Sequence, residues 1–295
     1  MCKQIWQISA ANFRRWRRNS QIILVFLLAF VVSFLLSNKV IIFAAEHETE
    51  LEFLEPFIWT FGDADSILIM SLLLLLLFAD MPNLGNEIPL FLVRTSRIRW
   101  MLGQIVYMVL ATLSLVTFIL ISTCVLAGNK AYLANLWSTT AATLGYSNIG
   151  EAIEVPSFVK VMELSFPYGC ALHIFGLMLG YSLMLASIIL FLNLFRSKGG
   201  MIGGVVFSCF GFIMNQDVLM QLLHIPRESI WKANILFGWI SPLNHATYYM
   251  HNFGYDNLPR LWQSYVFFFV GSAIFFGLAV LKSRRYGFDF TGTQR

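Results

Sequence analysis

Six long apolar stretches limit what this chain can fold into more than any other feature of its sequence. A helix needs roughly 20 apolar residues to cross the hydrocarbon core of a bilayer. Stretches near or above that length lie at 21–42, 57–79, 101–127, 166–195, 199–217 and 262–281. Only 12% of the 295 residues are charged, about half the share found in soluble domains. The sequence therefore predicts an all-α integral membrane protein with six transmembrane helices, forming a single domain over residues 1–295.

The charged residues divide unevenly between the two sides that these spans define. A cytoplasmic N-terminus leaves only six of the 20 basic residues outside, namely Lys39, Lys130, Lys160, Arg227, Lys232 and Arg260. The same topology leaves only three of the 16 acidic residues inside, namely Asp80, Glu87 and Asp289. Because Lys and Arg near the ends of spans set the orientation, we expect a multi-pass protein of the cell membrane with both termini in the cytoplasm.

The N-terminal segment 3–18 has the pattern of an amphipathic helix. At 100° per residue one arc is apolar, and it carries Ile5, Trp6, Ile8, Phe13 and Trp16. The opposite arc is polar and basic, with Lys3, Gln4, Gln7, Arg14, Arg15, Arg17 and Arg18. Tryptophan and basic residues suit the headgroup layer of an anionic inner leaflet. We predict an interfacial helix in contact with membrane lipid, which acts either as an anchor that fixes topology or as a lever that contacts a cytoplasmic partner.

The loop 80–100 is longer than a simple connection between two spans requires. Pro82, Asn83, Gly85 and Asn86 break the preceding helix, and residues 87–93 can form a short amphipathic helix. Three spaced basic residues follow, namely Arg94, Arg97 and Arg99. The apolar side chains of this segment need a surface to cover them. The loop is either a docking element for a protein partner or a passive connection on the membrane surface.

Two further patterns concern the packing of helices. Gly199 and Gly203, and Gly200 and Gly204, form pairs of small residues four positions apart, which allow helices to approach closely, within one chain or at a subunit interface.

Residues 230–250 are moderately apolar but contain Pro242, Asn244 and His245. A broken helix cannot face lipid because its free backbone groups would lack partners. We therefore expect a re-entrant helical segment before the last span.

Residues 46–55 are unusually acidic, with Glu46, Glu48, Glu50, Glu52 and Glu55 among them. Such a run is typical of a solvated loop, and we expect that structure here. The alternative is a role in repelling or releasing a transported molecule, because charges of one sign act together over about 8 to 10 Å at moderate salt.

The motifs that the sequence lacks narrow the possible functions. The sequence has no G-x-x-x-x-G-K-[ST] loop for ATP, no H-E-x-x-H motif of a metalloprotease and no G-x-S-x-G motif of a serine hydrolase. We therefore expect neither a metal site nor catalysis by this chain. Its spans contain almost no ionisable residues, whereas ion-coupled transporters place such residues at depth. Energy for any transport must then come from outside the chain. The alternative is a non-transport protein, either an intramembrane enzyme or a sensing or assembly subunit. The best candidate cluster for an enzyme is His173, Tyr181 and Asn193.

The layout resembles the permease subunits of type 2 ABC transporters. The resemblance covers nearly the whole chain: an amphipathic N-terminal helix, six spans, a coupling loop after the second span and a re-entrant pair before the last. It is carried best by Ala79 to Gly103, with an A-D-x-P break, the sequence LVRTSRIRW and the LGQ that follows. Ser241 and Pro242 match a Ser-Pro break that is frequent in the family. The bacterial members with a bare six-span permease include exporters of phenol-soluble modulins and of lantibiotics.

This resemblance implies a permease that is powered by a separate ABC ATPase subunit. The ATPase subunit would bind the ATP and Mg²⁺. The permease would work together with a second copy of itself or with a related permease. It implies no nucleic-acid partner, and an amphipathic peptide is the cargo that we expect. The implied ATPase-coupling residues are Glu87, Ile88, Leu90, Phe91, Arg94 and Arg97, with a second contact at Phe195, Arg196 and Lys198. It also implies that the first, second and fifth spans line the route and the dimer interface.

Overall fold

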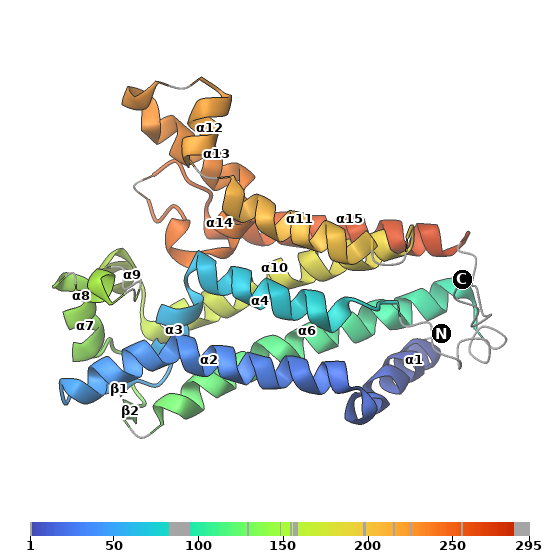
Figure 1. The fold of residues 1–295 in the computed structure, drawn as a ribbon, viewed down its shortest axis with the longest axis horizontal. Helices are drawn as coiled ribbons and strands as arrows, with labels where there is room; N and C mark the ends of the chain where they lie inside the picture. Colours follow the sequence, from blue (N-terminus) through green and yellow to red (C-terminus); the bar gives the residue numbers. More distant parts are fainter. Residues whose placement is uncertain are drawn as a thin grey trace.

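The computed structural model describes residues 2–82, 95–128, 130–147, 149–153, 155, 159–196, 199–214, 216–224, 226–254 and 256–285. Four of its helices are long and apolar enough to cross a membrane: α2 (Ser20–Glu46), α6 (Arg97–Ala127), α10 (Pro167–Asn193) and α15 (Leu261–Ser283). They lie side by side along the length of the molecule (Figure 1). The predicted all-α membrane class is confirmed.

A fifth candidate span is broken in the middle. Helix α3 (Glu55–Phe61) and helix α4 (Ala64–Phe78) meet at an angle of 85°. The side chain of Asp63 caps the new helix by accepting a hydrogen bond from the backbone N–H of Asp65, which is a frequent way to begin a helix. The predicted stretch 57–79 is therefore two helices, and only α4 runs along the bundle (Figure 1).

The predicted fifth span, 199–217, corresponds to α11 (Gly199–Ile213), which has only 15 residues. At 1.5 Å per residue it is too short to cross about 30 Å of hydrocarbon alone. Length and composition thus support four spans, or five with the bent pair, among the described residues. The predicted re-entrant segment is broken into α13 (Ile230–Ile240), α14 (Pro242–Ala246) and the short helix η3 (Tyr248–Met250).

Helix α10 is the centre of the bundle. In its most apolar window 67% of the residues are buried, compared with 28% in α2 and 17% in α15. It contacts α4, α6, α11 and α15, and its Tyr181 is only 1% exposed. The exposed faces of α2 and α15 carry large apolar side chains such as Phe30, Leu35 and Phe269, as expected for helices that face lipid.

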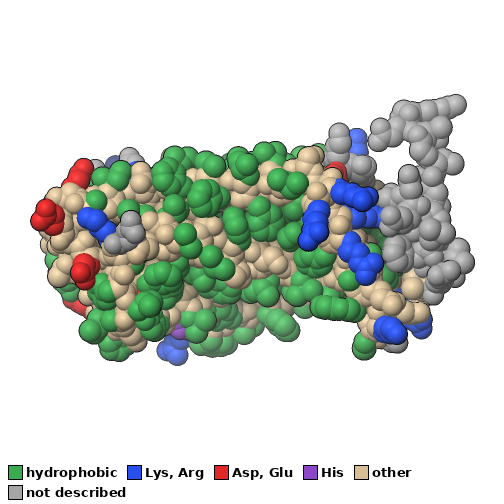
Figure 2. Space-filling model, turned by 90° about the horizontal axis from the view of Figure 1, so that it is seen from below, with side chains coloured by type: hydrophobic (Ala, Val, Ile, Leu, Met, Phe, Trp, Pro, Cys, Tyr) green, Lys and Arg blue, Asp and Glu red, His purple; other side chains and the backbone are tan. Residues whose placement is uncertain are grey.

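The two ends of the bundle differ in charge, and Figure 2 shows this division on one face of the molecule. We call the end that carries Arg14, Arg97 and Lys282 the basic end; it includes α1 (Cys2–Arg14) and η1 (Trp16–Arg18). We call the opposite end, which carries Glu46, Asp63 and Asp256, the acidic end.

The acidic end holds a pair of two-residue parallel strands, β1 (Leu51–Glu52) and β2 (Ala131–Tyr132). Its short helices are α7 (Thr139–Tyr146), α8 (Ile149–Ala152), α9 (Val159–Leu164), α12 (Gln216–Leu222), η2 (Arg227–Ser229), α13, α14 and η3. Helices α12 and α13 project sideways from the bundle at this end (Figure 1).

Candidate functional site

A cavity lies at the acidic end of the molecule. Its volume is about 450 Å³. Helices α2, α3 and α4 supply nearly all of its wall, with Leu36, Lys39, Val40, Trp59, Thr60, Asp63, Asp65, Ser66, Ile69 and Val155. The 85° bend between α3 and α4 forms one side of this cavity, because it turns α3 away from the bundle axis.

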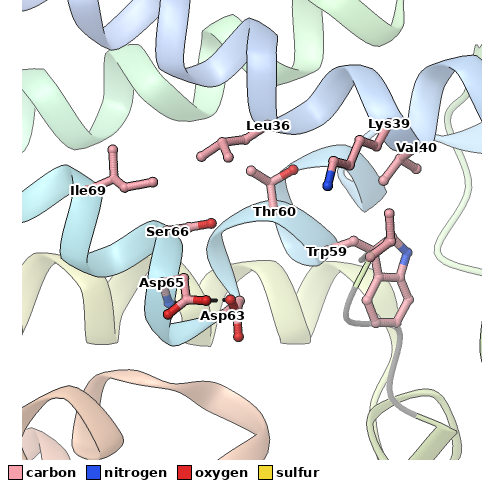
Figure 3. Close-up of a pocket in the computed structure, with 10 residues that line it drawn as sticks. Leu36, Lys39, Val40, Trp59, Thr60, Asp63, Asp65, Ser66 and Ile69 are labelled. Atoms are coloured by element: carbon pink, nitrogen blue, oxygen red, sulfur yellow. Dashed lines mark hydrogen bonds between the residues drawn. The ribbon is translucent and has the colours of Figure 1, made fainter. Parts of the chain in front are cut away.

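Charged groups of both signs line the cavity. Lys39 is the only charged residue within the predicted first span, and its side chain extends from α2 on one side (Figure 3). Asp63 and Asp65 lie on the other side, at the start of α4. The phenol of Tyr249 donates a hydrogen bond of 3.0 Å to Asp63 Oδ1 and so fixes that carboxylate.

Two polar atoms of the cavity wall are buried and have no hydrogen-bond partner within the described part of the chain. Among the described residues, no hydrogen bond is formed by Trp59 Nε1 or by Thr60 Oγ1. The two side chains are 2% and 6% exposed. Figure 3 shows the Thr60 hydroxyl directed to the side on which Lys39 enters. An unpaired buried polar group costs about 1–3 kcal/mol, so this wall is less stable than a purely apolar wall would be.

Two glutamates lie buried beside this region, which corrects the expectation of a solvated acidic loop. Glu52 and Glu55 are both 0% exposed. Glu55 Oε1 accepts a hydrogen bond of 2.7 Å from the Ser138 backbone, and its Oε2 accepts bonds from Ser138 Oγ at 2.5 Å and from the Glu52 backbone at 3.2 Å. Glu52 Oε1 has no partner among the described residues. The loop folds inward because Ser138, which follows β2, supplies donors that water would otherwise provide.

Burial changes the protonation of these carboxyl groups, which lie outside the predicted span 57–79. Desolvation raises the pKa of Glu55 to about 7, although the hydrogen bonds from Ser138 oppose this change. Desolvation also raises the pKa of Glu52. The acidic end therefore holds one carboxyl group, that of Glu55, that exchanges a proton near neutral pH. The sequence alone does not reveal this, because Ser138, the hydrogen-bond partner of Glu55, lies far away along the chain.

Two buried histidines share one serine at the same end. His245 Nδ1 and His251 Nε2 each lie 2.8 Å from Ser264 Oγ. The ring of His245 also stacks on Phe267 at 4.5 Å. None of these three residues lines the cavity described above. The cluster joins α14 and the segment after η3 to the start of α15. Among the described residues no three metal-ligating side chains come together.

The polar cluster predicted for an intramembrane enzyme is not assembled. His173 Nδ1 lies 3.1 Å from the phenol oxygen of Tyr265, whereas Tyr181 bonds Ser71 at 3.2 Å. Asn193 instead joins three helix ends, since its Nδ2 donates to the carbonyls of Ala79 and Met81 and its Oδ1 accepts from the Gly200 backbone. Each residue has separate partners, and no joint site results.

At the basic end, α1 lies lengthwise on the first turns of α6. Ile8 is 3% exposed, and a Cβ at Gly103 would come within 2.7 Å of it. Asn12 donates to Gln104 at 2.8 Å, Trp16 to the phenol of Tyr107 at 3.0 Å, and Arg99 to Gln4 at 3.0 Å. We call this contact the α1–α6 seam.

The α1–α6 seam shows which surface the predicted apolar arc of α1 covers. Phe13 and Trp16 stack on each other at 4.8 Å, and Phe13 also contacts Tyr107. Ile5 is partly buried, whereas Trp6 is 62% exposed. Arg14 ends the helix and is exposed. The arc therefore covers α6, and Trp6 remains available to another surface.

Most of the predicted coupling residues lie outside the described residues, namely Glu87, Ile88, Leu90, Phe91, Arg94 and Lys198. Arg97 is the third described residue after this gap, and its guanidinium donates a hydrogen bond of 3.0 Å to the carbonyl of Arg284. Phe195 is 59% exposed and lies 4.3 Å below the ammonium of Lys282. Arg196 is exposed beside it. These three residues all belong to the basic end.

The predicted glycine pairs face other helices of the same chain. A Cβ at Gly200 would lie 2.2 Å from the carbonyl of Ile189, and one at Gly203 would lie 2.0 Å from Leu192. A Cβ at Gly204 would meet Leu75 at 2.4 Å, and one at Gly199 would meet the carbonyl of Leu192 at 3.0 Å. Close approach of α11 to α10 and α4 therefore requires glycine here.

Comparison of the chain with models of protein families, with curated proteins and with solved structures finds no match.

Proposed function

We propose that this chain is the permease subunit of an ATP-driven exporter, with six spans and with its basic end in the cytoplasm. In this proposal the broken second span, 57–79, consists of α4 and the part of α3 that follows Pro56, and α11 makes a short fifth span. A separate ABC ATPase subunit binds ATP and Mg²⁺ and docks at the basic end. A second permease, identical or related, completes the route for an amphipathic peptide.

The α1–α6 seam is the observation that carries this proposal. Helix α6 begins at Arg97, immediately after the segment that resembles a coupling loop. Its first turns are tied by hydrogen bonds to α1 at Gln104 and Arg99, and to η1 at Tyr107. With 31 residues α6 is about 46 Å long, so it exceeds the hydrocarbon thickness of about 30 Å. A displacement of the coupling segment would move α6 and α1 as one body.

The distribution of charge supports an external energy source. In the described part of the four long helices, the charged side chains lie near the ends, at Lys39, Glu46, Arg97, Arg99 and Lys282. A transporter driven by protons or sodium needs ionisable groups within the bilayer, where they bind and release the coupling ion. A partner that hydrolyses ATP has no such requirement.

The test uses the full chain in nanodiscs with its candidate ATPase. Changing Glu87, Leu90 and Phe91 together to Ala should abolish co-purification of the two proteins, because these residues form the proposed docking face. The matched control changes the exposed Leu133 and Leu136 of the acidic end to Ala and should leave the complex intact. Association that survives the triple change would contradict the docking site.

The cargo is tested on the same preparation. Stimulation of ATP hydrolysis by cationic amphipathic peptides should be seen with the intact complex and should be lost in the triple variant. A stable complex whose rate of ATP hydrolysis does not change with such peptides would be consistent with a permease but would contradict the peptide cargo.

A further inference from the structure

The ring nitrogens of His245 and His251 all have partners within the chain. His245 Nε2 lies 3.1 Å from the backbone carbonyl oxygen of Trp239, and His251 Nδ1 lies 3.0 Å from that of Tyr248. The other nitrogen of each ring lies 2.8 Å from Ser264 Oγ. The two histidines are 3% and 1% exposed, so the protein itself must satisfy these four contacts.

Two neutral histidines cannot satisfy all four contacts. A carbonyl oxygen only accepts hydrogen bonds, so the nitrogens that face Trp239 and Tyr248 must each carry a proton. A neutral imidazole has one N–H, so both nitrogens that face Ser264 are then acceptors. The Ser264 hydroxyl has one proton to donate. One of the two rings is therefore left with a nitrogen lone pair directed at the oxygen of Ser264.

One additional proton completes the cluster. The protonated ring donates through both of its nitrogens, and Ser264 accepts one of these bonds while it donates its own proton to the other ring. A second additional proton has no place, because Ser264 would face two donors and its own proton would need a new acceptor. Burial lowers the pKa of His251 to about 4, and a charge on His245 contributes to this change. A ring that stays neutral beside a charged one is expected to behave in this way.

Two neighbours favour a positive charge on His245. Its partner Trp239 lies in the last turn of α13, where the carbonyls have no partner within the helix and favour a cation. The ring of Phe267 stacks on that of His245 with centroids 4.5 Å apart, and the face of an aromatic ring attracts positive charge. Burial lowers the pKa of His245, which lies outside the long helices, whereas its bond to Trp239 raises it. The bond to Ser264 adds to this second effect.

Other titratable groups belong to the elements that pack around this cluster. They are Asp63 and Asp65 at the start of α4, Cys170 and His173 of α10, Cys209 of α11, Lys232 of α13, Tyr248 and Tyr249 of η3, and Tyr265 of α15. Asp63 accepts a bond from Tyr249, and His173 contacts Tyr265. The partners of His245 and His251 are two carbonyls and one hydroxyl, so hydrogen bonds rather than an ion pair would hold an added proton.

We propose that His245, Ser264 and His251 form a binding site for one proton, which His245 holds and which Ser264 connects by a hydrogen bond to a neutral His251. The completed chain of bonds joins α13, α14, η3 and the start of α15, at the place where the projecting helices α12 and α13 meet the bundle (Figure 1). The site requires neither an ATPase nor a cargo, and it is independent of the proposed function.

The experiment follows the protonation of the five histidines in the full chain. The protein is labelled with ¹⁵N-histidine, placed in nanodiscs and titrated by solid-state NMR, and each signal is assigned by replacing one histidine at a time. On acidification His245 should become charged first, while His251 stays neutral with its proton on Nδ1. The two midpoints should differ by more than about one pH unit. Charging of His251 first, or of both rings together, would overturn the proposal.

The variant His251→Gln separates the proposed hydrogen bond from a simple effect of charge. The Gln amide can donate to Ser264, which is then free to donate to a neutral His245, so the additional proton is no longer needed. We expect the midpoint of His245 to fall by about one pH unit, a tenfold loss of proton affinity that corresponds to one hydrogen bond. If His251 acted only as a nearby positive charge, its removal would raise this midpoint. An unchanged or raised midpoint would therefore contradict the proposal.

Two further variants test the role of Ser264. Ser264→Ala removes the acceptor of the proton on His245 and should lower the midpoint of His245 in the same direction, which keeps the test available if His251→Gln does not fold. His173→Gln is the matched control, because His173 contacts Tyr265 rather than Ser264, and it should not lower the midpoint of His245. A fall in this control as large as that in His251→Gln would overturn the assignment to Ser264.

Discussion

The acidic end and the basic end are both held together by buried polar groups, but the chemistry of those groups differs. The acidic end buries Glu52, Glu55, His245 and His251, side chains of the two types whose unperturbed pKa values lie at about 4 and about 6.5. The α1–α6 seam uses amides, an indole and a phenol instead, together with an arginine that stays charged. We therefore expect the stability of the acidic end to depend on pH and that of the α1–α6 seam to be independent of it.

The largest expected effect is a pair of opposite pH dependences at the acidic end. The pKa of Glu55 is raised to about 7 by burial, so the fold favours its protonated form. The stability that this form contributes is present below pH 4.5 and is lost as the pH rises through 7. Burial lowers the pKa of His251, which lies outside the long helices, to about 4. Its contribution is present above pH 6.5 and is lost as the pH falls towards 4.

Each contribution amounts to about 3 kcal/mol over its window, and in the wild type the two oppose each other. In Glu55→Gln the histidine effect remains, so the melting temperature should fall more steeply on acidification than in the wild type. In His251→Asn the carboxyl effect remains, so stability should fall as the pH rises from 5 to 8. The measurement is the melting temperature from tryptophan fluorescence across this range. If the melting temperatures of both variants change with pH in the same way as that of the wild type, these two groups do not control the stability.

Matched controls exist on the surface of the same end. Glu46→Gln and His224→Asn change exposed residues of the same types and should leave the pH profile of the wild type unchanged. A change in the profile of either control would place the pH dependence in the general charge of the acidic end rather than in the buried pair.

The second effect concerns the basic end, where Asn193 joins α4, α10 and α11. Asn193→Leu removes its hydrogen bonds to Ala79, Met81 and Gly200 and leaves the Gly200 N–H without its acceptor. We expect a loss of about 2 kcal/mol in the free energy of unfolding, equal at pH 5 and pH 8. Asn257→Leu, at an exposed position, is the control and should change the melting temperature little. A loss in the free energy of unfolding that differs between pH 5 and pH 8 would contradict the expected difference between the two ends.

The long helices could be predicted from the sequence because their apolar stretches are uniform. The predicted bounds 21–42, 101–127, 166–195 and 262–281 lie within a few residues of α2, α6, α10 and α15. The break at Gly62 and Asp63 is also visible in the sequence. The 85° bend is not, because its direction depends on the burial of Phe57 and Phe61 against other helices.

The candidate site could be predicted only in part, because its partners are far apart in the sequence. Five glutamates in ten residues indicate solvent, and only the nearby Phe53, Leu54 and Phe57 hint that the loop folds inward. Ser138, which makes burial of Glu55 tolerable, is 83 residues away. Lys39 offered a better signal, since a lone charge within an apolar stretch is expensive and often functional.

The smallest expected effect tests the α1–α6 seam. A Cβ at Gly103 would lie 2.7 Å from Ile8, so Gly103→Ala should push α1 away from α6 at a cost of about 1 kcal/mol. Trypsin should then cleave faster within residues 14–18, which hold four arginines, and the increase should be the same at pH 7 and pH 8.5.

Gly277→Ala is the matched control, because its Cβ would meet nothing within 4 Å on the exposed side of α15. Both changes gain the same helix propensity, so the difference between them isolates the contact with Ile8. If both variants are cleaved at the wild-type rate, α1 does not depend on this close approach. The rigid connection between α1 and α6 on which the proposed coupling rests would then need another source.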